Sequence, residues 1–258
     1  MNPIIEHLRS HASVRQFTDR DINAEDELTI VATAERSPTS SNLHAYSIVS
    51  VRDQEKKARL AVLTGNQNHV AACPLFLVFC ADLHRLQTIA DVKGYPCHAE
   101  HTEAFVVATV DAALAADRAL IAAQALGIWG VMVGGIRNQP DDVCELLELP
   151  SLVYPVMGMS VGYPAAPPKT KPRLPLGGLW FKEKYDESAP NAAVEEYDRI
   201  IDAGGHLNGR EVEKPNYPDF KGTYSWSEHS ARRMASTSPN VLRPHLLDFL
   251  RSRGFLKK

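Results

Sequence analysis

The stretch VDAALAADRALIAAQALGIWGVMVGGIRN (residues 110–138) limits the possible folds, because it holds the most apolar segment of the chain. With the residues before it, its first half predicts a helix over about 101–126 that ends at Gly127. This helix is apolar on nearly all sides, so we expect it at the centre of the fold or in a subunit interface. Asp111 and Asp117 lie in its middle, which argues for a buried helix rather than a membrane span.

The second half of the stretch, IWGVMVGGIRN (residues 128–138), predicts a buried strand that runs into a turn at Gly134 and Gly135. Two adjacent glycines let a backbone approach a flat ligand without an intervening Cβ. The pattern is not GxGxxG, so it does not indicate a Rossmann dinucleotide site. A tight exit from the strand explains the same two residues, and both interpretations stay open at this point.

Outward from this stretch, helical and strand-like patterns alternate along the chain. We expect helices over residues 2–10, 23–36, 54–65, 140–149, 192–203, 227–236 and 240–254. We expect further strands over residues 45–51, 74–82 and 154–164. Residues 83–100 show no clear pattern and are expected to form a mobile excursion. Few strands among long helices indicate an α/β or α+β protein.

Composition excludes several classes of function. The chain has 258 residues, which fits one large domain or two small ones, and its net charge of −3 gives no general attraction to nucleic acid or anionic membranes. Its four cysteines show neither CxxC spacing nor a disulfide-rich pattern. The first residues lack the basic start and apolar run of a signal peptide. We therefore expect a cytoplasmic protein with reduced thiols.

A row of polar side chains lies close to the start of the chain, in HASVRQF (residues 11–17). If this segment is extended, His11, Ser13 and Arg15 share one face and span about 13 Å at roughly 3.3 Å per residue. An imidazole, a hydroxyl and a guanidinium in one row could bind an anionic ligand. Ordinary exposed polar residues after a short first helix explain the same spacing.

Two further segments could hold an anion or a heterocycle. Hydroxyls and backbone N–H groups are close together in the turn TSSN (residues 39–42). Lys169, Lys171 and Arg173 alternate in the extended, proline-rich stretch PPKTKPRLP and could place three cations on one side. A plain turn and a solvated basic loop are the alternatives.

A metal site and a hydrolase site are two further possibilities. Cys97, His98 and His101 stand near Glu100, but the chain offers no second ligand pair at zinc-finger spacing. An exposed polar loop without metal is the favoured interpretation. No GxSxG pattern occurs, and Ser160 is expected within a strand rather than at a nucleophile elbow.

Taken together, several motifs resemble the nitroreductase family in their order and spacing, most closely its oxygen-insensitive NADPH nitroreductases and NADPH–flavin oxidoreductases. They are HASVRQF, PTSSNLHAYSIV, LTGNQNHVAACPLFLVFCAD, the stretch 110–138 and KPRLP, and the resemblance resumes in YSWSEHSARR and RPHLLDFLRSRGF. It implies an α+β fold in which helices wrap a small antiparallel sheet, and an intertwined homodimer. It also implies a single domain over residues 1–258. Within it, residues 204–226 would be a mobile nucleotide-binding excursion and residues 237–258 would pack on the partner chain.

The resemblance further implies an FMN site at each dimer interface. The residues that match the family's FMN-binding positions are His11, Ser13, Arg15, Ser40, Ser41, Asn42, Gln67, Val133, Gly134, Gly135, Lys171 and Arg173. Ser40 and Ser41 would come from the second chain. Arg210 is the candidate for the 2′-phosphate of NADPH, although Glu211 and Glu213 beside it leave NADH possible as the donor.

The expected activity follows from that cofactor. An FMN-dependent NAD(P)H oxidoreductase would reduce nitroaromatics, quinones or free flavin in two-electron, ping-pong turnovers, with no side-chain acid or base required. The alternative is a flavin-binding module that supplies reduced FMN to a partner oxygenase. The two hypotheses use the same FMN residues, and turnover with a small-molecule acceptor distinguishes them.

Overall fold

The computed structural model describes residues 2–209 and 224–258. The chain divides into two compact units, which are treated separately below. One unit comprises Met1–Thr170 together with Arg243–Lys258, and the other comprises Lys171–Leu242. The chain therefore leaves the first unit, forms the second, and then returns to the first.

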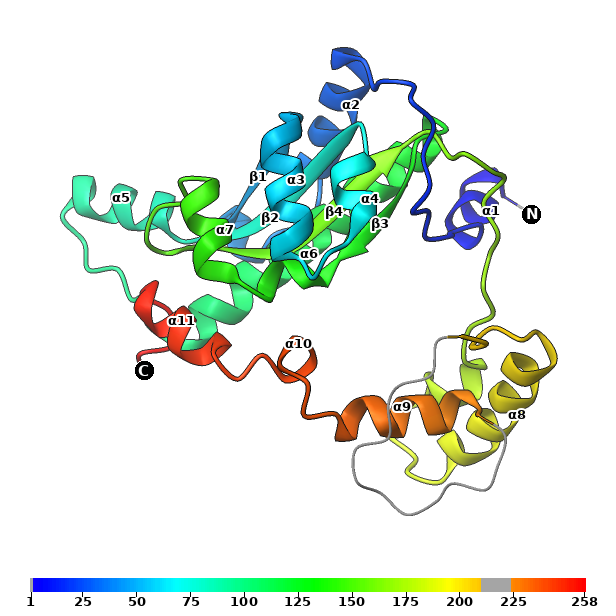
Figure 1. Ribbon diagram of the computed structural model, residues 1–258. Helices are drawn as coiled ribbons and strands as arrows, with labels where there is room; N and C mark the ends of the chain where they lie inside the picture. Colours follow the sequence, from blue (N-terminus) through cyan, green and yellow to red (C-terminus); the bar gives the residue numbers. More distant parts are fainter. Residues whose placement is uncertain (1, 210–223) are drawn as a thin grey trace. The chain divides into compact units, whose positions relative to one another are not determined.

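The first unit contains a four-stranded antiparallel sheet in the order β1-β2-β4-β3 (Figure 1). Its strands are β1 (Tyr46–Val51), β2 (Leu75–Asp82), β3 (Trp129–Val133) and β4 (Val153–Gly162). Every residue of the central strand β2 is buried, as its continuous apolar run predicts. The α+β fold with a small antiparallel sheet is thus confirmed.

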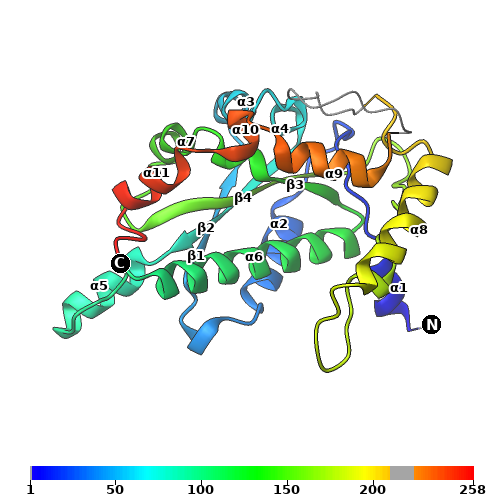
Figure 2. The ribbon, with the colours of Figure 1, turned by 90° about the horizontal axis from the view of Figure 1, so that it is seen from below.

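The two faces of β2 pack against different helices. Leu75, Leu77 and Phe79 belong to the apolar cluster shared with α2 (Ala24–Glu35) and α6 (Thr102–Ala125). The intervening Phe76, Val78 and Cys80 belong to the cluster shared with α3 (Gln54–Leu63), α4 (Asn68–Ala72) and α7 (Pro140–Leu146). Figure 2 shows α2 and α6 on one side of the sheet and α3 and α7 on the other. This alternation is the two-residue period of a strand buried on both faces.

Helix α6 packs against one face of the sheet in the first unit and supplies a large part of its core. Its buried residues are mostly alanines, whose small side chains let the helix lie close to the sheet. Val106, Val110 and Leu114 form a separate exposed stripe, with 44%, 49% and 40% of their surface accessible. Among the described residues, no helix is both long and apolar enough to cross a membrane.

Shorter helices complete both units. The first unit also contains α1 (Pro3–Arg9), α5 (His84–Lys93) and α11 (Leu246–Ser252). The second unit contains α8 (Ala189–Ala203), α9 (Trp226–Ala235) and α10 (Pro239–Leu242). There the rings of Tyr197 and Trp226 pack edge to face at 5.2 Å, and Asp198 accepts hydrogen bonds from the backbone N–H and hydroxyl of Ser227. These contacts join α8 to α9.

The structure resolves one open assignment and corrects one expectation from the sequence. Residues 84–93, which showed no clear pattern in the sequence, form α5, and this helix ends at Gly94 in the left-handed conformation (φ +74°). The mobility expected for residues 83–100 stays a prediction. This helix has no buried residue, and Leu86 packs only partly buried against the core, so its apolar positions are a weak signal. The single helix expected over 240–254 is broken between α10 and α11, because Arg243 adopts φ +47° before Pro244.

The buried carboxylate of Asp111 on α6 ties the turn after α2 to the core. Its two oxygens accept backbone N–H groups of Ser40 and Ala45, each at 3.1 Å. We expect Asp111→Ala to lower the free energy of unfolding by about 3 kcal/mol, because it leaves those donors unpaired. Urea unfolding measures the change. Asp117→Ala, on the exposed side of the same helix, is the control and should stay within about 0.5 kcal/mol of wild type. A loss below about 1 kcal/mol at Asp111 would contradict the assignment.

Candidate functional site

The segment 11–17 lies along one end of the sheet. The backbone N–H of Val14 donates to the carbonyl of Gly130 at 3.0 Å, and that of Thr18 donates to Tyr163 at 2.8 Å. Ala12 is buried, whereas Ser13 and Arg15 are exposed. The alternation expected from HASVRQF is therefore present at Ala12, Ser13 and Arg15, whereas His11 is half-buried.

His11 at the start of this segment is fixed to α6. Its Nδ1 lies 3.0 Å from the side-chain nitrogen of Gln124, a buried residue near the end of the helix. Because an amide nitrogen can only donate, Nδ1 is the acceptor. Gln124 thus holds the imidazole that begins the polar row.

The turn at Gly134 and Gly135 packs against the loop between α3 and α4. A Cβ on Gly135 would lie 2.2 Å from the carbonyl oxygen of Thr64 and 2.5 Å from the side-chain nitrogen of Gln67. Only glycine allows this approach. In contrast, the nearest described atom to a Cβ on Gly134 would be Nη2 of Arg137, at 3.4 Å. Gly135 is therefore required for close packing against Thr64 and Gln67, whereas the turn is more open at Gly134.

A chain of hydrogen bonds runs through Gln67 and His69. The Gln67 side-chain nitrogen donates to Thr64 O at 2.7 Å, and its oxygen lies 3.1 Å from Nε2 of His69. Nδ1 of His69 lies 3.0 Å from the hydroxyl of the fully buried Ser160 on β4. Burial, and then the positive charge of Arg15, lower the pKa of His69. The structure thus brings Arg15, Gln67 and Gly135 into one neighbourhood in the first unit.

His69 and Ser160 are residues that the sequence analysis missed as part of this neighbourhood. His69 stands two positions after Gln67 in GNQNH, and that proximity was the available signal. Ser160 is 91 positions away from His69, and only the packing of α4 beside β4 brings it near. It has no role as an elbow nucleophile here, because it lies inside β4.

The turn with Ser40, Ser41 and Asn42 contacts α6 at a different position, through Asp111. Ser41 and Asn42 adopt φ +49° and φ +57°, and the turn is held by Asp111. Asp111 and Gln124 are thirteen positions apart in this helix, about 20 Å at roughly 1.5 Å per residue. Within one chain, therefore, the anchor of this turn and the anchor of His11 are far apart along α6.

Three predicted cationic residues lie outside the first unit. Lys171 and Arg173 belong to the second unit, where both are exposed and the Arg173 guanidinium donates to the backbone carbonyls of Lys171 and Pro172 at 3.2 and 3.3 Å. Arg210 lies outside the described residues.

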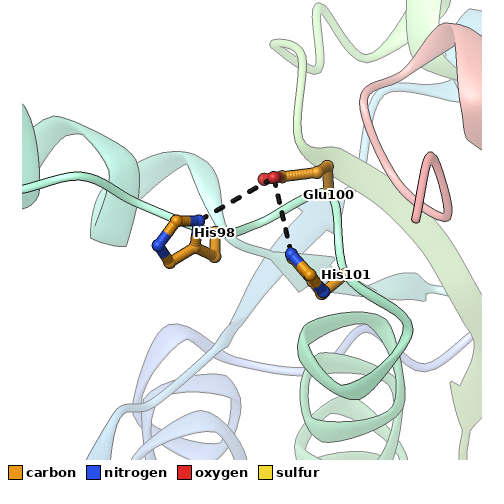
Figure 3. Close-up of side chains that lie close together, drawn as sticks. All are labelled: His98, Glu100 and His101. Carbon is orange, nitrogen blue, oxygen red and sulfur yellow. Dashed lines mark ion pairs between the residues drawn. The ribbon is translucent and has the colours of Figure 1, made fainter.

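Among the described residues, one group of three potential metal ligands occurs: His98, Glu100 and His101, with ligand atoms all within 4.8 Å of one another (Figure 3). The Glu100 carboxylate lies 3.8 Å from Nδ1 of His98 and 3.7 Å from Nε2 of His101. It also accepts a hydrogen bond from the Lys258 ammonium at 2.9 Å. An ammonium on the carboxylate and the positive N-terminal end of α6 beside it both oppose a cation at this place. We therefore interpret Glu100 as a carboxylate paired with Lys258, with the two histidines close to it.

Comparison with known proteins identifies the family. The model of the nitroreductase family matches residues 8–163, and that of the nitroreductase family C-terminal domain matches residues 171–258. The chain belongs to the nitroreductase family.

Relatives cover essentially the whole chain. It is 38% identical to the FMN reductase (NADPH) of Bacillus subtilis over 100% of both chains. It is 34% identical to the oxygen-insensitive NADPH nitroreductase of Salmonella typhimurium over 99% of both chains. The solved structure of the NADPH:FMN oxidoreductase from Vibrio harveyi, complexed with NAD⁺, is 33% identical, covers 100% of both chains and superposes with a TM-score of 0.86. The resemblance read from the ordered motifs is confirmed.

The Glu100–Lys258 pair gives a prediction about pH. The Lys258 ammonium holds the pKa of Glu100 at about 2, below its ordinary 4.5. Because the pKa is lowered in the folded state, the contribution to stability is present above pH 4.5 and is lost as the pH falls toward 2. A carboxyl NMR titration should show a midpoint near 2.

Substitutions of two neighbouring lysines are the matched variants for this titration. Lys258→Gln should move the midpoint of Glu100 upward, toward 4.5. Lys257→Gln should leave it unchanged, because Lys257 contacts residue 100 through its backbone N–H. A wild-type midpoint at 4.5 would show that the pair does not form in solution.

Proposed function

We propose that this protein is an FMN-dependent oxidoreductase that takes electrons from NADPH. The observation that carries the proposal is the neighbourhood of Arg15, Gln67 and Gly135 at one end of the sheet, in a chain of the nitroreductase family. These groups suit the parts of a flavin nucleotide. A guanidinium matches phosphate oxygens, an amide matches the polar edge of the ring, and an open glycine backbone matches its flat surface.

The residues of the first unit would bind FMN in two ways. His11, Ser13 and Arg15 would bind the ribityl phosphate and the pyrimidine side. Gln67 would hydrogen-bond the polar edge of the ring, and the backbone at Val133, Gly134 and Gly135 would face it. Lys171 and Arg173, in the second unit, stay predictions as FMN ligands on the strength of the family resemblance alone.

Bound FMN supplies the redox chemistry, the uptake of a hydride equivalent from NADPH and its transfer to a second substrate. The protein's own part is to orient and to stabilise charge. The Arg15 cation and the donors around Gln67 favour an electron-rich ligand. No side-chain acid or base is required for this transfer, and Gln67 would act through hydrogen bonding alone.

The second substrate is proposed at the level of chemical class. Nitroaromatics, quinones and free flavins are flat, electron-poor molecules, and the names of the relatives include both a nitroreductase and an FMN reductase. Supply of reduced FMN to a partner oxygenase is the second candidate, because an FMN reductase is among the relatives with the highest identity given above. NADPH, rather than NADH, is proposed as the donor because both of these relatives are named for NADPH.

A homodimer is part of the proposal. The exposed stripe of Val106, Val110 and Leu114 borders an apolar hollow of about 350 Å³ that also includes Thr39 and Ser40. A second chain seated on this stripe would cover apolar surface, which favours association. The distance along α6 between the two anchors supports the expectation that Ser40 and Ser41 serve the site of the partner chain.

Absorption spectroscopy tests the function directly. We expect the purified, desalted protein to retain a flavin spectrum that bleaches on anaerobic addition of NADPH and recovers on addition of a quinone. Slower bleaching with NADH would support the preference for NADPH. A protein that stays colourless after incubation with FMN and desalting would contradict the proposal. Bleaching without recovery in the presence of quinones and nitroaromatics would favour the supply of reduced FMN to a partner.

Arg15→Ala tests the phosphate contact in the same assay. Loss of a charge-assisted hydrogen bond should raise the dissociation constant for FMN about 10- to 100-fold, equivalent to about 1.5–3 kcal/mol. Arg59→Ala, which removes an exposed arginine on α3, is the control and should bind FMN like wild type. Equal affinity in the two variants would remove Arg15 from the site.

The two glycines of the turn give a paired test of the ring-facing backbone. Gly135→Ala should destabilise the protein by about 2 kcal/mol, because its Cβ overlaps the Thr64 carbonyl. Gly134→Ala should fold with wild-type stability but bind FMN more weakly, since its methyl group would occupy the open side of the turn. Thermal unfolding and FMN titration measure both effects. Unchanged FMN affinity in Gly134→Ala would show that the ring does not lie against this glycine.

A further inference from the structure

The Gln67 side chain makes two hydrogen bonds, to Thr64 and to His69, and a third bond links His69 to the distant Ser160. An amide oxygen can only accept and an amide nitrogen can only donate. The nitrogen of Gln67 faces the carbonyl oxygen of Thr64 at 2.7 Å, an acceptor, so the amide has its nitrogen on that side. Its oxygen is therefore the atom 3.1 Å from Nε2 of His69.

This orientation fixes the tautomer of His69. Since the Gln67 oxygen accepts, Nε2 of His69 must carry a hydrogen. The lowered pKa of His69, which follows from burial and from the Arg15 charge, favours the neutral ring, whose Nδ1 is then an acceptor. The Ser160 hydroxyl at 3.0 Å is the donor to Nδ1.

The surroundings of Ser160 leave its hydroxyl proton available for that bond. Ser160 is fully buried, and the thiol of Cys73 is a polar neighbour. Burial raises the pKa of Cys73, so the thiol is neutral, and its S–H donates to the carbonyl of Val70 at 3.2 Å. Cys73 therefore does not require the proton of Ser160.

We propose that His69 is a positioning residue that holds the Gln67 amide with its oxygen toward the imidazole, so that Gln67 presents an N–H donor to the bound cofactor. The proposal rests on the proposed FMN function. The nitrogen is the amide atom next to the glycine turn, 2.5 Å from where a Cβ of Gly135 would lie. One of its two hydrogens is directed to Thr64, and the other is the donor available to a ligand.

The consequence concerns the reduction potential of the flavin. Reduction adds electron density to the ring, so a fixed N–H donor at its polar edge stabilises the reduced form more than the oxidised form. His69 thus acts on the potential without touching the cofactor. A flipped amide would present its oxygen instead and would favour the oxidised form.

Two substitutions of His69 separate this role from simple packing. In His69→Gln the side-chain nitrogen reaches the place of Nε2, so a donor to Gln67 remains. In His69→Asn the shorter side chain places its amide nearer to Nδ1, so the donor to Gln67 is lost. His84→Gln, at the exposed start of α5, is the control for loss of a histidine elsewhere.

The first measurements are the dissociation constant for oxidised FMN and the midpoint potential of bound FMN, found by equilibration with a reference dye. For His69→Asn we expect affinity for reduced FMN to fall about fivefold more than affinity for oxidised FMN, which makes the potential more negative. His69→Gln and His84→Gln should keep the wild-type potential. A purely structural role would weaken both forms alike, so an unchanged potential in His69→Asn would overturn the proposal, as would equal shifts in Asn and Gln.

A second measurement needs no flavin. In the ¹⁵N NMR spectrum of the FMN-free protein, His69 should be the neutral tautomer with its hydrogen on Nε2. A hydrogen on Nδ1 with none on Nε2 would overturn the proposal. A wild-type protein that binds no FMN would instead contradict the proposed function, and the imidazole spectrum would still decide the orientation of Gln67.

Discussion

The close packing of α6 against the sheet is the constraint on which the first unit depends. Its buried face is built largely of alanine, so the helix axis can lie near β2 and β4. Two polar residues interrupt this face, and each fixes a segment that would otherwise be loose. Asp111 holds the turn after α2, and Gln124 holds the imidazole of His11. The same helix thus determines the core and the position of both groups of FMN-binding candidates.

The candidate site depends on satisfied hydrogen bonds more than on exposed charge. The loop between α3 and α4 approaches the glycine turn so closely that only Gly135 fits there, and this approach brings Gln67 beside the turn. His69 and Ser160 extend the contact to the buried strand β4. A ligand at this end of the sheet would therefore meet groups that are already oriented, which lowers the entropic cost of binding.

Local signals in the sequence predicted most of the elements, whereas contacts between distant residues were not predictable. Asn23 caps α2 as expected, with its side chain accepting the N–H of Asp26, and the apolar run of β2 is buried throughout. The exposed helix α5 has no buried residue, and its few apolar positions gave only a weak periodic signal. The contact of His69 with Ser160 depends on where α4 packs on the sheet, which no local pattern encodes. For the same reason the sequence did not predict the ion pair of Glu100 with Lys258, and it indicated only a cluster of possible metal ligands around Glu100.

The return of the chain to the first unit has a consequence for folding during synthesis. Phe249, Leu250 and Phe255 are buried in the core of the first unit, where Phe255 packs edge to face on Tyr154 at 5.2 Å. The ribosome must therefore translate the whole second unit before the first can close its core. Until then an incomplete apolar surface is exposed on the nascent chain, which is the condition under which chaperones engage their clients. For the same reason a chain cut after Thr170 would lack part of its own core, although the separate family match to residues 171–258 suggests a convenient boundary there.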